Sequence, residues 1–243
     1  MALPKIDVPL FEIDLPLSKK KIKYRPFLVK EEKLLLMAME SAEEKTILDA
    51  IKQIVNNCSL ESLDVDTLPI SDLEYFFLQL RAKSVGEIVE LQYKCNNIVK
   101  DETGAEKPCN NVDNFELNVL DIVPSTEGHS NKIELSENLG MVMKYPSFSM
   151  VEDKENASEV DKIMSIVMKC IDYIYDADNI YYRKDVSNEE LKEFVESLTQ
   201  AQFANVQKFF ETIPTLKKNV HFKCTKCGYE EDITIQGIQN FFA

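Results

Sequence analysis

Tryptophan is absent from this sequence, histidine occurs twice, and glycine occurs only six times. The few glycines form no glycine-rich loop that could cradle a phosphate, and there is no Gly-x-Ser-x-Gly nucleophile elbow. These absences exclude several common enzyme classes. We therefore expect a protein that is not an enzyme, with no catalytic residues and no small-molecule substrate.

Long apolar runs are also missing. No stretch approaches the roughly 20 apolar residues that a helix needs to cross a bilayer. The first 21 residues interrupt their apolar positions with Pro and Asp, unlike a secretory signal. The sequence therefore predicts no membrane-spanning segment and a location in a cytoplasm.

Basic residues are scarce relative to acidic ones. The chain has 28 Lys and Arg against 42 Asp and Glu, a formal charge of -14. A field of this sign repels phosphate backbones unless the cations cluster, so nucleic acid is not an expected partner. The one basic run, Lys19, Lys20, Lys21 and Lys23, fits either contact with an acidic partner or a solvated strand edge that discourages aggregation.

The length of 243 residues and the hydrophobic content of 44% suffice to bury a core without disulfides. Apolar spacing changes from a period of 3.6 to a period of two and back, which predicts an α+β fold. We expect a single domain over residues 1–243. In it a bundle-like helical part, residues 30–85 and 156–213, packs beside an antiparallel β-module, residues 87–120 and 218–236, with a zinc-ribbon-like pair of hairpins.

Local signals place the individual elements. A capping box pairs a Ser or Thr with an acid or Gln three residues later, and such boxes predict helix starts at Ser71, Ser187 and Thr199. The expected helices cover residues 30–57, 71–85, 156–175, 187–198 and 199–213. The expected strands lie within residues 19–28, 87–95, 115–122, 132–145, 219–224 and 229–235. Residues 5–17 fit an extended arm or an edge strand.

Two of the six cysteines occupy positions where a small hydrophobic residue would serve. Cys58 and Cys170 each continue a series of apolar residues with helical spacing. We expect both to lie in the core. Cysteine used in this way is typical of a reducing compartment.

The other four cysteines form two pairs, each flanked by predicted strands. Cys224 and Cys227 have the close spacing of a zinc knuckle, and Gly228 permits a tight turn of the backbone. Cys95 and Cys109 would supply the second pair, on either side of a polar stretch that predicts a long hairpin loop or a mobile flap. Two such hairpins can present four thiolates to one zinc ion, so we predict a structural zinc site.

Lysines accompany these cysteines in an otherwise acidic chain, which favours thiolate over thiol. They are Lys94, Lys107, Lys223 and Lys226. Two other interpretations stay open. The ribbon could have lost its ion, or Cys224 and Cys227 could be a redox pair, although a strand rather than the usual helix is predicted to follow them.

The histidines and one acidic stretch carry weaker signals. His221 lies near Cys224, but four sulfurs already complete a tetrahedron, so we do not expect it to bind metal. His129 lies in a polar loop and is expected to be solvated. The acidic residues within 172–185 lack the ligand order of a calcium-binding EF-hand. We interpret this stretch as a turn between helices.

Four segments, in this order along the chain, resemble one known family. They are YRPFLVKEEKLLLMAMES, FFLQLRAKSVGEIVEL, SNEELKEFVESLTQAQFANVQKFFETIPTL and FKCTKCGYEEDITIQGIQNFF. The family is that of the baseplate hub assembly proteins of T-even-like tailed bacteriophages, and the likeness covers residues 20–243. It implies a non-enzymatic assembly factor or structural subunit of the hub, acting in the host cytoplasm or within the virion's tail baseplate.

The resemblance also implies that the partners are other baseplate hub proteins. It marks Cys224, Cys227, Gly228, the segment 80–86, Phe241 and Phe242. With the basic run, the expected contact residues are Lys20, Lys21, Lys23, Arg81, Lys83, Phe241 and Phe242. Two alternatives come from other classes: a zinc-ribbon adaptor in transcription, which the charge disfavours, and a thiol oxidoreductase.

Overall fold

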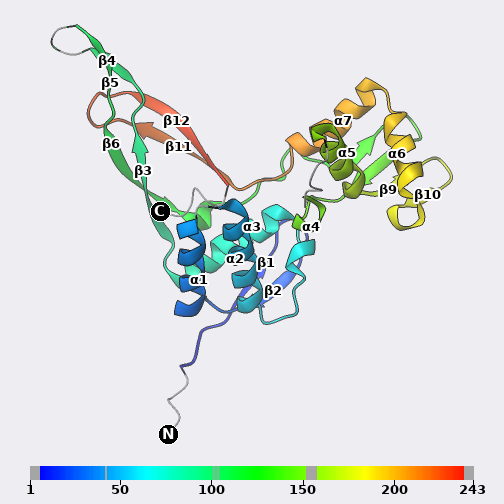
Figure 1. Ribbon diagram of the computed structural model, residues 1–243, viewed down its shortest axis with the longest axis horizontal. Coiled ribbons are helices and arrows are strands. Elements are labelled where there is room, and N and C mark those ends of the chain that lie inside the picture. The colour runs from blue at the N-terminus through cyan, green and yellow to red at the C-terminus, as the bar shows by residue number, and fades with distance from the viewer. Residues whose placement is uncertain (1–5, 42, 101, 103, 152–157, 238–243) are drawn as a thin grey trace. The chain divides into compact units, whose positions relative to one another are not determined.

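The α+β class is confirmed by the computed structural model, in which helices lie beside small antiparallel sheets (Figure 1). The structure describes residues 6–41, 43–100, 102, 104–151 and 158–237. The chain groups into two compact units. The first comprises residues 1–63, 73–124 and 215–243, and the second comprises residues 64–72 and 125–214.

The first unit combines three helices with four hairpins. Its helices are α1 (Val29–Ser41), α2 (Glu44–Cys58) and most of α3 (Ile70–Ser84). Its paired strands are β1 (Phe11–Asp14) with β2 (Lys21–Tyr24), β3 (Ile88–Lys94) with β6 (Val112–Asn118), β4 (Ile98–Lys100) with β5 (Glu106–Pro108), and β11 (Lys217–Lys223) with β12 (Glu230–Gln236). A short 3-10 turn, η2 (Val119–Asp121), follows β6.

The helix predicted over residues 30–57 is in fact two helices. The Ser41 hydroxyl donates to Ala38 O at 2.7 Å and accepts from Glu43 N–H at 3.3 Å, and Glu43 has an extended backbone. A serine that bonds its neighbouring backbone in this way competes with helical hydrogen bonds. The prediction failed here because the apolar spacing continues across the break.

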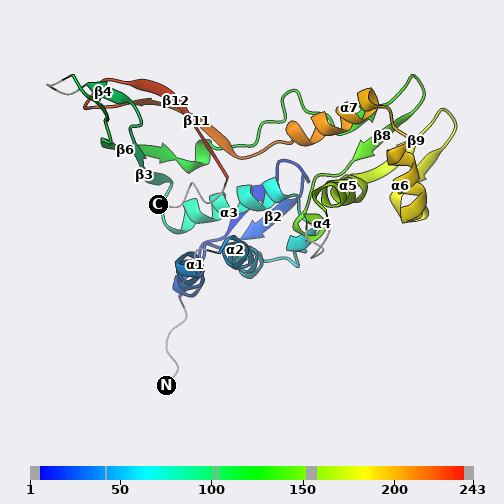
Figure 2. The ribbon, with the colours of Figure 1, turned by 45° about the horizontal axis from the view of Figure 1, so that its top comes forward.

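The hairpins β3–β6 and β11–β12 lie side by side in both views of the ribbon (Figures 1 and 2). Their inward residues alternate along the strands, as the period of two predicts. Val89 of β3, Leu117 of β6 and Ile235 of β12 share one buried cluster with Leu78 of α3. This cluster anchors both hairpins on helix α3.

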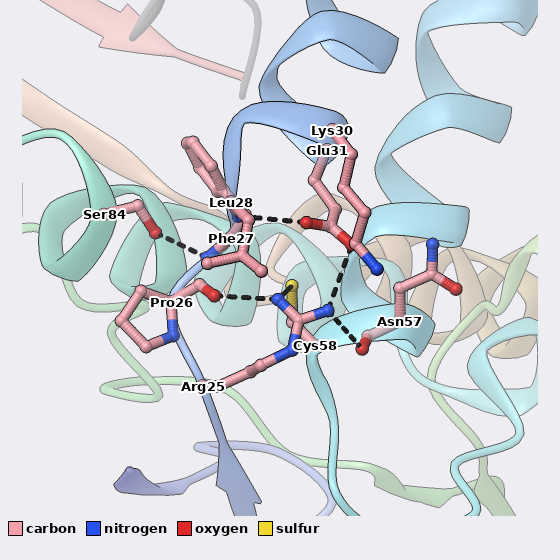
Figure 3. Close-up of polar contacts among 9 residues, drawn as sticks. All are labelled: Arg25, Pro26, Phe27, Leu28, Lys30, Glu31, Asn57, Cys58 and Ser84. Atoms are coloured by element: carbon pink, nitrogen blue, oxygen red, sulfur yellow. Dashed lines mark hydrogen bonds and ion pairs between the residues drawn. The ribbon is translucent and has the colours of Figure 1, made fainter. Parts of the chain in front are cut away.

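A buried ion pair ties the start of α1 to the end of α2 (Figure 3). Glu31 Oε1 accepts a hydrogen bond from Arg25 Nη2 at 3.0 Å, and Glu31 Oε2 accepts one from Leu28 N–H at 2.9 Å. The Arg25 guanidinium also donates to Asn57 O at 3.1 Å. Burial alone would raise the pKa of Glu31, but the hydrogen bonds from Arg25 and Leu28 outweigh it and hold that pKa below its usual value.

The second unit is a four-stranded antiparallel sheet with helices. Its strands, in the order β10-β9-β8-β7, are Ile180–Tyr182, Ile171–Tyr175, Gly140–Met143 and Lys132–Glu134. Its helices are α4 (Phe148–Val151), α5 (Glu159–Cys170), α6 (Asn188–Glu196) and α7 (Gln200–Glu211), with 3-10 turns η1 (Val65–Thr67) and η3 (Arg183–Asp185).

The predicted helix 156–175 was extended too far. Helix α5 ends at Cys170, and the next five residues form strand β9, which pairs with β8. Ile171 and Ile174 are buried, so they satisfy a helical and a strand interpretation equally well. The acidic stretch is likewise a hairpin and not a turn between helices, because Asp176 Oδ1 accepts from the N–H groups of Asp178 and Asn179 between β9 and β10.

Two of the three predicted capping boxes are confirmed. Ser187 and Thr199 cap α6 and α7, each with the reciprocal bond from its partner at the third helical position. Ser71 instead lies inside α3, and its hydroxyl donates to Pro214 O at 2.5 Å. The predicted helix start is thus within one residue of the observed start at Ile70, although Ser71 is not the capping residue.

The prediction that Cys58 and Cys170 lie in the core is confirmed. Both side chains are fully buried, and both cysteines are free thiols. Burial raises the pKa of Cys58 to about 11 and that of Cys170 to about 12. Neither thiol is therefore a nucleophile near neutral pH.

The expected division of the chain stays a prediction. It placed residues 30–85 and 156–213 in one helical part of a single domain, whereas these two stretches fall mainly in different compact units. The β-module, residues 87–120 and 218–236, lies within the first unit. Among the described residues, no helix is both long enough and apolar enough to cross a membrane.

His129 is not solvated as expected. Its Nδ1 lies 2.9 Å from Thr212 Oγ1, and its ring packs against Tyr145 and Phe209 at centroid distances of 5.5 and 5.2 Å. Its Nε2 is buried without a hydrogen-bond partner. Burial therefore lowers the pKa of His129.

This burial predicts a pH dependence for the second unit. When the folded pKa of a histidine lies below its unfolded value, the neutral form favours the folded state. Its contribution to the free energy of unfolding is complete above about pH 6.5 and is lost as pH falls through the folded pKa. As the pH decreases below this value, we expect the free energy of unfolding to fall by at most about 1.4 kcal/mol per pH unit, because one proton is involved. Thermal unfolding of the wild type and of His129→Gln between pH 5 and 7 tests this, because the variant should have a flatter profile. Parallel profiles would contradict it.

Candidate metal centre

Four cysteines from two hairpins converge at one point in the first unit. Cys95 Sγ lies 3.7 Å from Cys227 Sγ, and Cys109 Sγ lies 3.8 Å from Cys224 Sγ. All four sulfurs lie within 4.8 Å of one another. Three of the side chains are buried and Cys227 is half-buried. The structure therefore brings together the two pairs that the sequence analysis selected.

The long insertion between Cys95 and Cys109 does not separate them. Its middle forms the hairpin β4–β5, which continues beyond the ends of β3 and β6 (Figure 1). Its ends are joined by backbone hydrogen bonds, Cys109 N–H to Asn97 O and Cys95 N–H to Asn111 O, both 2.8 Å. The insertion thus lengthens the loop without changing the position of the two sulfurs.

The two cysteine turns share a backbone conformation. Gly228, which follows Cys227, has a φ of 73°, and Asn110, which follows Cys109, has a φ of 50°. Both values lie in the left-handed region, which glycine adopts freely and asparagine tolerates better than most residues. Gly228 N–H also donates to Cys224 O at 3.0 Å. Gly228 therefore forms the tight backbone turn that the sequence predicted, and Asn110 takes the same position in the other turn.

Backbone N–H groups point at the sulfurs. The amide of Tyr229 donates to the Cys227 thiol and lowers the pKa of Cys227 to about 6. At Cys95 burial is the larger effect and raises the pKa to about 12, although the amide of Asn97 works against it. Amides directed at sulfur favour thiolates, which are the form that binds metal.

Polar side chains that the sequence analysis did not select join the two hairpins beside the cluster. Asn97 Nδ2 lies 3.6 Å from Cys227 Sγ. Asp113 of β6 accepts hydrogen bonds from the Thr225 N–H, at 3.1 Å, and from the Thr225 hydroxyl. Tyr93 donates to Glu231 at 3.0 Å. Their positions within four residues of a cysteine were the available signal, but polar residues are common at such positions.

One of the lysines near the cysteines, Lys223, pairs with a carboxylate of the neighbouring strand. Lys223 Nζ lies 2.6 Å from Glu230, and this contact raises the pKa of Lys223. Its charge is therefore directed at a cross-strand carboxylate. His221 behaves in the same way, because its Nδ1 lies 2.9 Å from Asp232 Oδ1 and its side chain is exposed. His221 is not part of the four-residue cluster.

Three of the other candidate contact residues, Lys20, Lys21 and Lys23, lie in or next to strand β2. Lys21 pairs with Glu12 at 2.8 Å, while Lys20 and Lys23 are exposed. Phe241 and Phe242 lie outside the described residues.

Arg81 and Lys83 are engaged near the end of α3. Arg81 is half-buried and donates to Gly86 O at 3.2 Å, and burial lowers its pKa. Lys83 pairs with Glu87 at 2.8 Å. The neighbouring Ser84 hydroxyl accepts from Phe27 N–H at 2.9 Å (Figure 3). These contacts give the polar residues of segment 80–86 a structural role.

The sulfur spacing fits a metal site and does not fit disulfides. A disulfide has sulfurs about 2.05 Å apart, and the closest sulfurs here are 3.7 Å apart. Four thiolates at about 2.3 Å from a central zinc ion would be about 3.8 Å from one another on a regular tetrahedron. The four clustered cysteines can therefore bind a metal ion.

These features define the class of protein: an α+β chain with a four-cysteine cluster between two hairpins and a predominantly acidic composition. A comparison with family models then identifies its relatives. The chain belongs to the T4 bacteriophage base plate protein family, whose model matches residues 8–243. No curated protein and no solved structure matched the chain.

Proposed function

We propose that this base plate protein is a non-enzymatic assembly factor or structural subunit of the baseplate hub, acting through contacts with other hub proteins. The observation that carries the proposal is the family match over residues 8–243, which includes both compact units. The residues that we assign to partner contact are Lys20, Lys21, Lys23, Arg81, Lys83, Phe241 and Phe242. Lys20 and Lys23 are exposed.

We further propose that the four cysteines hold one structural zinc ion. Four sulfur ligands leave no open coordination position, which is typical of structural sites and unlike catalytic ones. A redox role is less well supported, because Cys224 and Cys227 lie in the turn between strands β11 and β12, and a redox pair normally opens a helix. The ion would add a further link between two hairpins that already share a buried cluster on α3.

Infection with a phage that lacks this gene tests the assembly role. We expect hub intermediates to be absent or incomplete, while the other baseplate parts are still made. Affinity purification of the tagged protein from infected cells should recover hub proteins. Comparison with the composition of finished particles then separates a transient assembly factor from a subunit. Normal hubs in the absence of the gene would refute the proposal.

Asn97→Ala tests the groups around the proposed zinc ion. Loss of a residue that hydrogen-bonds a metal ligand typically weakens metal affinity by about 10–100-fold, and the 3.6 Å contact to Cys227 suggests the lower end of that range. We expect a decrease of about tenfold, measured by competition with a chelator of known affinity. Asn114→Ala, at an exposed position of β6, is the control and should leave the affinity unchanged.

A further inference from the structure

The second unit has an apolar groove between helices α5 and α7. The groove has a volume of about 350 Å³. Its apolar lining consists of Ile163, Ile166 and Val167 from α5 and Phe203, Val206 and Phe210 from α7. Gln207 and Glu211 of α7 form its polar border. The two helices that form it are labelled in Figure 1.

The apolar surface continues beyond the groove along α5. Ile163 is 56% exposed and Val160, one turn earlier, is 69% exposed. Both lie on the same helical face as Val167, which is buried. An apolar strip that extends from a groove onto an exposed helix face is typical of a surface that binds another protein.

Charge indicates what kind of partner fits this surface. The second unit has 20 acidic and 9 basic residues, a net charge of -11, whereas the first unit has 22 acidic and 19 basic residues, a net charge of -3. Most of the net negative charge of the chain is therefore in the unit that contains the groove. Such a field attracts cationic partners and repels acidic ones.

Among the described residues that line the groove, the one charged side chain is acidic. Glu211 borders it directly, and Glu159 and Asp161 are exposed at the start of α5. The basic residue of this turn, Lys162, lies 3.2 Å from Glu159, which compensates its charge. Lys208 of α7 lines a different cavity. An apolar floor with an acidic border favours a segment that is apolar on one face and basic at its edges.

We propose that this groove binds an amphipathic helical segment of another protein, with an apolar face and lysine or arginine flanks. A helix presents anchors at positions i, i+3, i+4 and i+7, which suits a groove between two helices. The identity of the partner as a baseplate protein rests on the proposed function. The docking chemistry itself is tested with purified protein alone, so the two proposals can fail separately.

Two synthetic helical peptides test this inference by fluorescence anisotropy. Both have leucines at the same i, i+3, i+4 and i+7 positions, and one has lysines where the other has glutamates. We expect the lysine peptide to bind at least about tenfold more tightly than the glutamate peptide, and its affinity to decrease as salt is added. Equal binding of the two peptides, or binding of neither, would overturn the proposal.

Matched variants locate the binding surface. Ile163→Gln should weaken binding of the lysine peptide by about tenfold, because it removes an apolar anchor contact. Ile180→Gln is the control, since Ile180 of β10 is exposed to a similar extent, 54%, and does not line the groove. Glu211→Lys should also weaken binding and reduce its salt dependence. Equal effects of the two isoleucine variants would overturn the assignment.

Two further results would assign the groove to another occupant and thus refute an external partner. Self-association of the protein that disappears in Ile163→Gln would identify a second copy of the chain. Tighter peptide binding after removal of residues 238–243 would identify the chain's own apolar tail. We expect no self-association of the wild type and no tighter peptide binding after the truncation. Circular dichroism should confirm that each variant is folded.

Discussion

Replacing Cys227 by Ser is expected to abolish zinc binding and to disrupt the joined hairpins of the first unit. Protein purified without added zinc should contain about one ion per chain, and the variant should contain none. In zinc-finger peptides, binding of a structural zinc ion contributes on the order of 10 kcal/mol to the free energy of folding. That is comparable with the total stability of a domain, about 5–15 kcal/mol. The effect should therefore be the largest of any single substitution in this chain.

The structural consequence should be local. The cluster beside the cysteines is small, with Phe222 as its buried aromatic residue and the ring of Tyr93 at a centroid distance of 4.7 Å. Without the ion, we expect faster amide hydrogen exchange in residues 95–111 and 224–229. Helices α1 and α2 should be less affected, because they have their own buried contacts. Hydrogen exchange with mass spectrometry distinguishes these regions.

A matched control is available within the same chain. Cys170→Ala also removes a buried free thiol, but Cys170 lies in α5 and has no place in the cluster. It should lower stability modestly and retain the full zinc content. Less than about a tenth of an ion per chain in the wild type would exclude a structural zinc site. Full zinc content in Cys227→Ser would exclude this ligand set.

The cysteine cluster could be predicted because its signal is local. Each pair is flanked by strands with a period of two, and Gly228 immediately follows the Cys-x-x-Cys. Each hairpin holds its two cysteines close together, so packing of the two hairpins against each other is enough to bring four sulfurs together. The caps at Ser187 and Thr199 were predictable for the same reason, since each depends on residues three positions apart.

Other features depend on contacts between distant segments, and the sequence did not reveal them. The boundary between α5 and β9 is set by pairing with β8, a strand about 30 residues earlier. Ser71 was expected to cap α3 but bonds instead to Pro214, 143 residues away. His129 was expected in solvent, yet it is held by Tyr145 and Phe209. In each case a tertiary contact determined the outcome where local propensity was ambiguous.

Glu31 is the clearest example of this limit and leads to the second large effect. Sequence position alone would explain Glu31 as an acid in the first turn of a helix, where the helix dipole favours negative charge. The structure shows its side chain only 1% exposed and paired with Arg25, whose side chain is 17% exposed. Arg25 lies just before α1, and it also contacts the end of α2 through Asn57 O and Cys58 Sγ (Figure 3). One ion pair therefore joins three segments.

Glu31→Ala should destabilise the first unit by about 3–5 kcal/mol, because it leaves a partly buried guanidinium without its partner. Urea unfolding followed by circular dichroism measures this difference. Glu32→Ala is the control: Glu32 is the adjacent acid of the same helical turn but is exposed. It should change stability by less than about 1 kcal/mol. Similar effects of the two variants would show that the helix dipole, and not the ion pair, explains the acid at this position.

The pH dependence provides an independent test of the same ion pair. The folded pKa of Glu31 lies below its unfolded value. The contribution of Glu31 to the free energy of unfolding is therefore complete above about pH 4.3, the usual pKa of glutamate. It is lost as pH falls through the folded pKa. Glu31→Gln has no charge to titrate, so its stability should fall less steeply than that of the wild type below about pH 4.3. An unchanged slope would mean that Arg25 does not stabilise the ionised carboxylate.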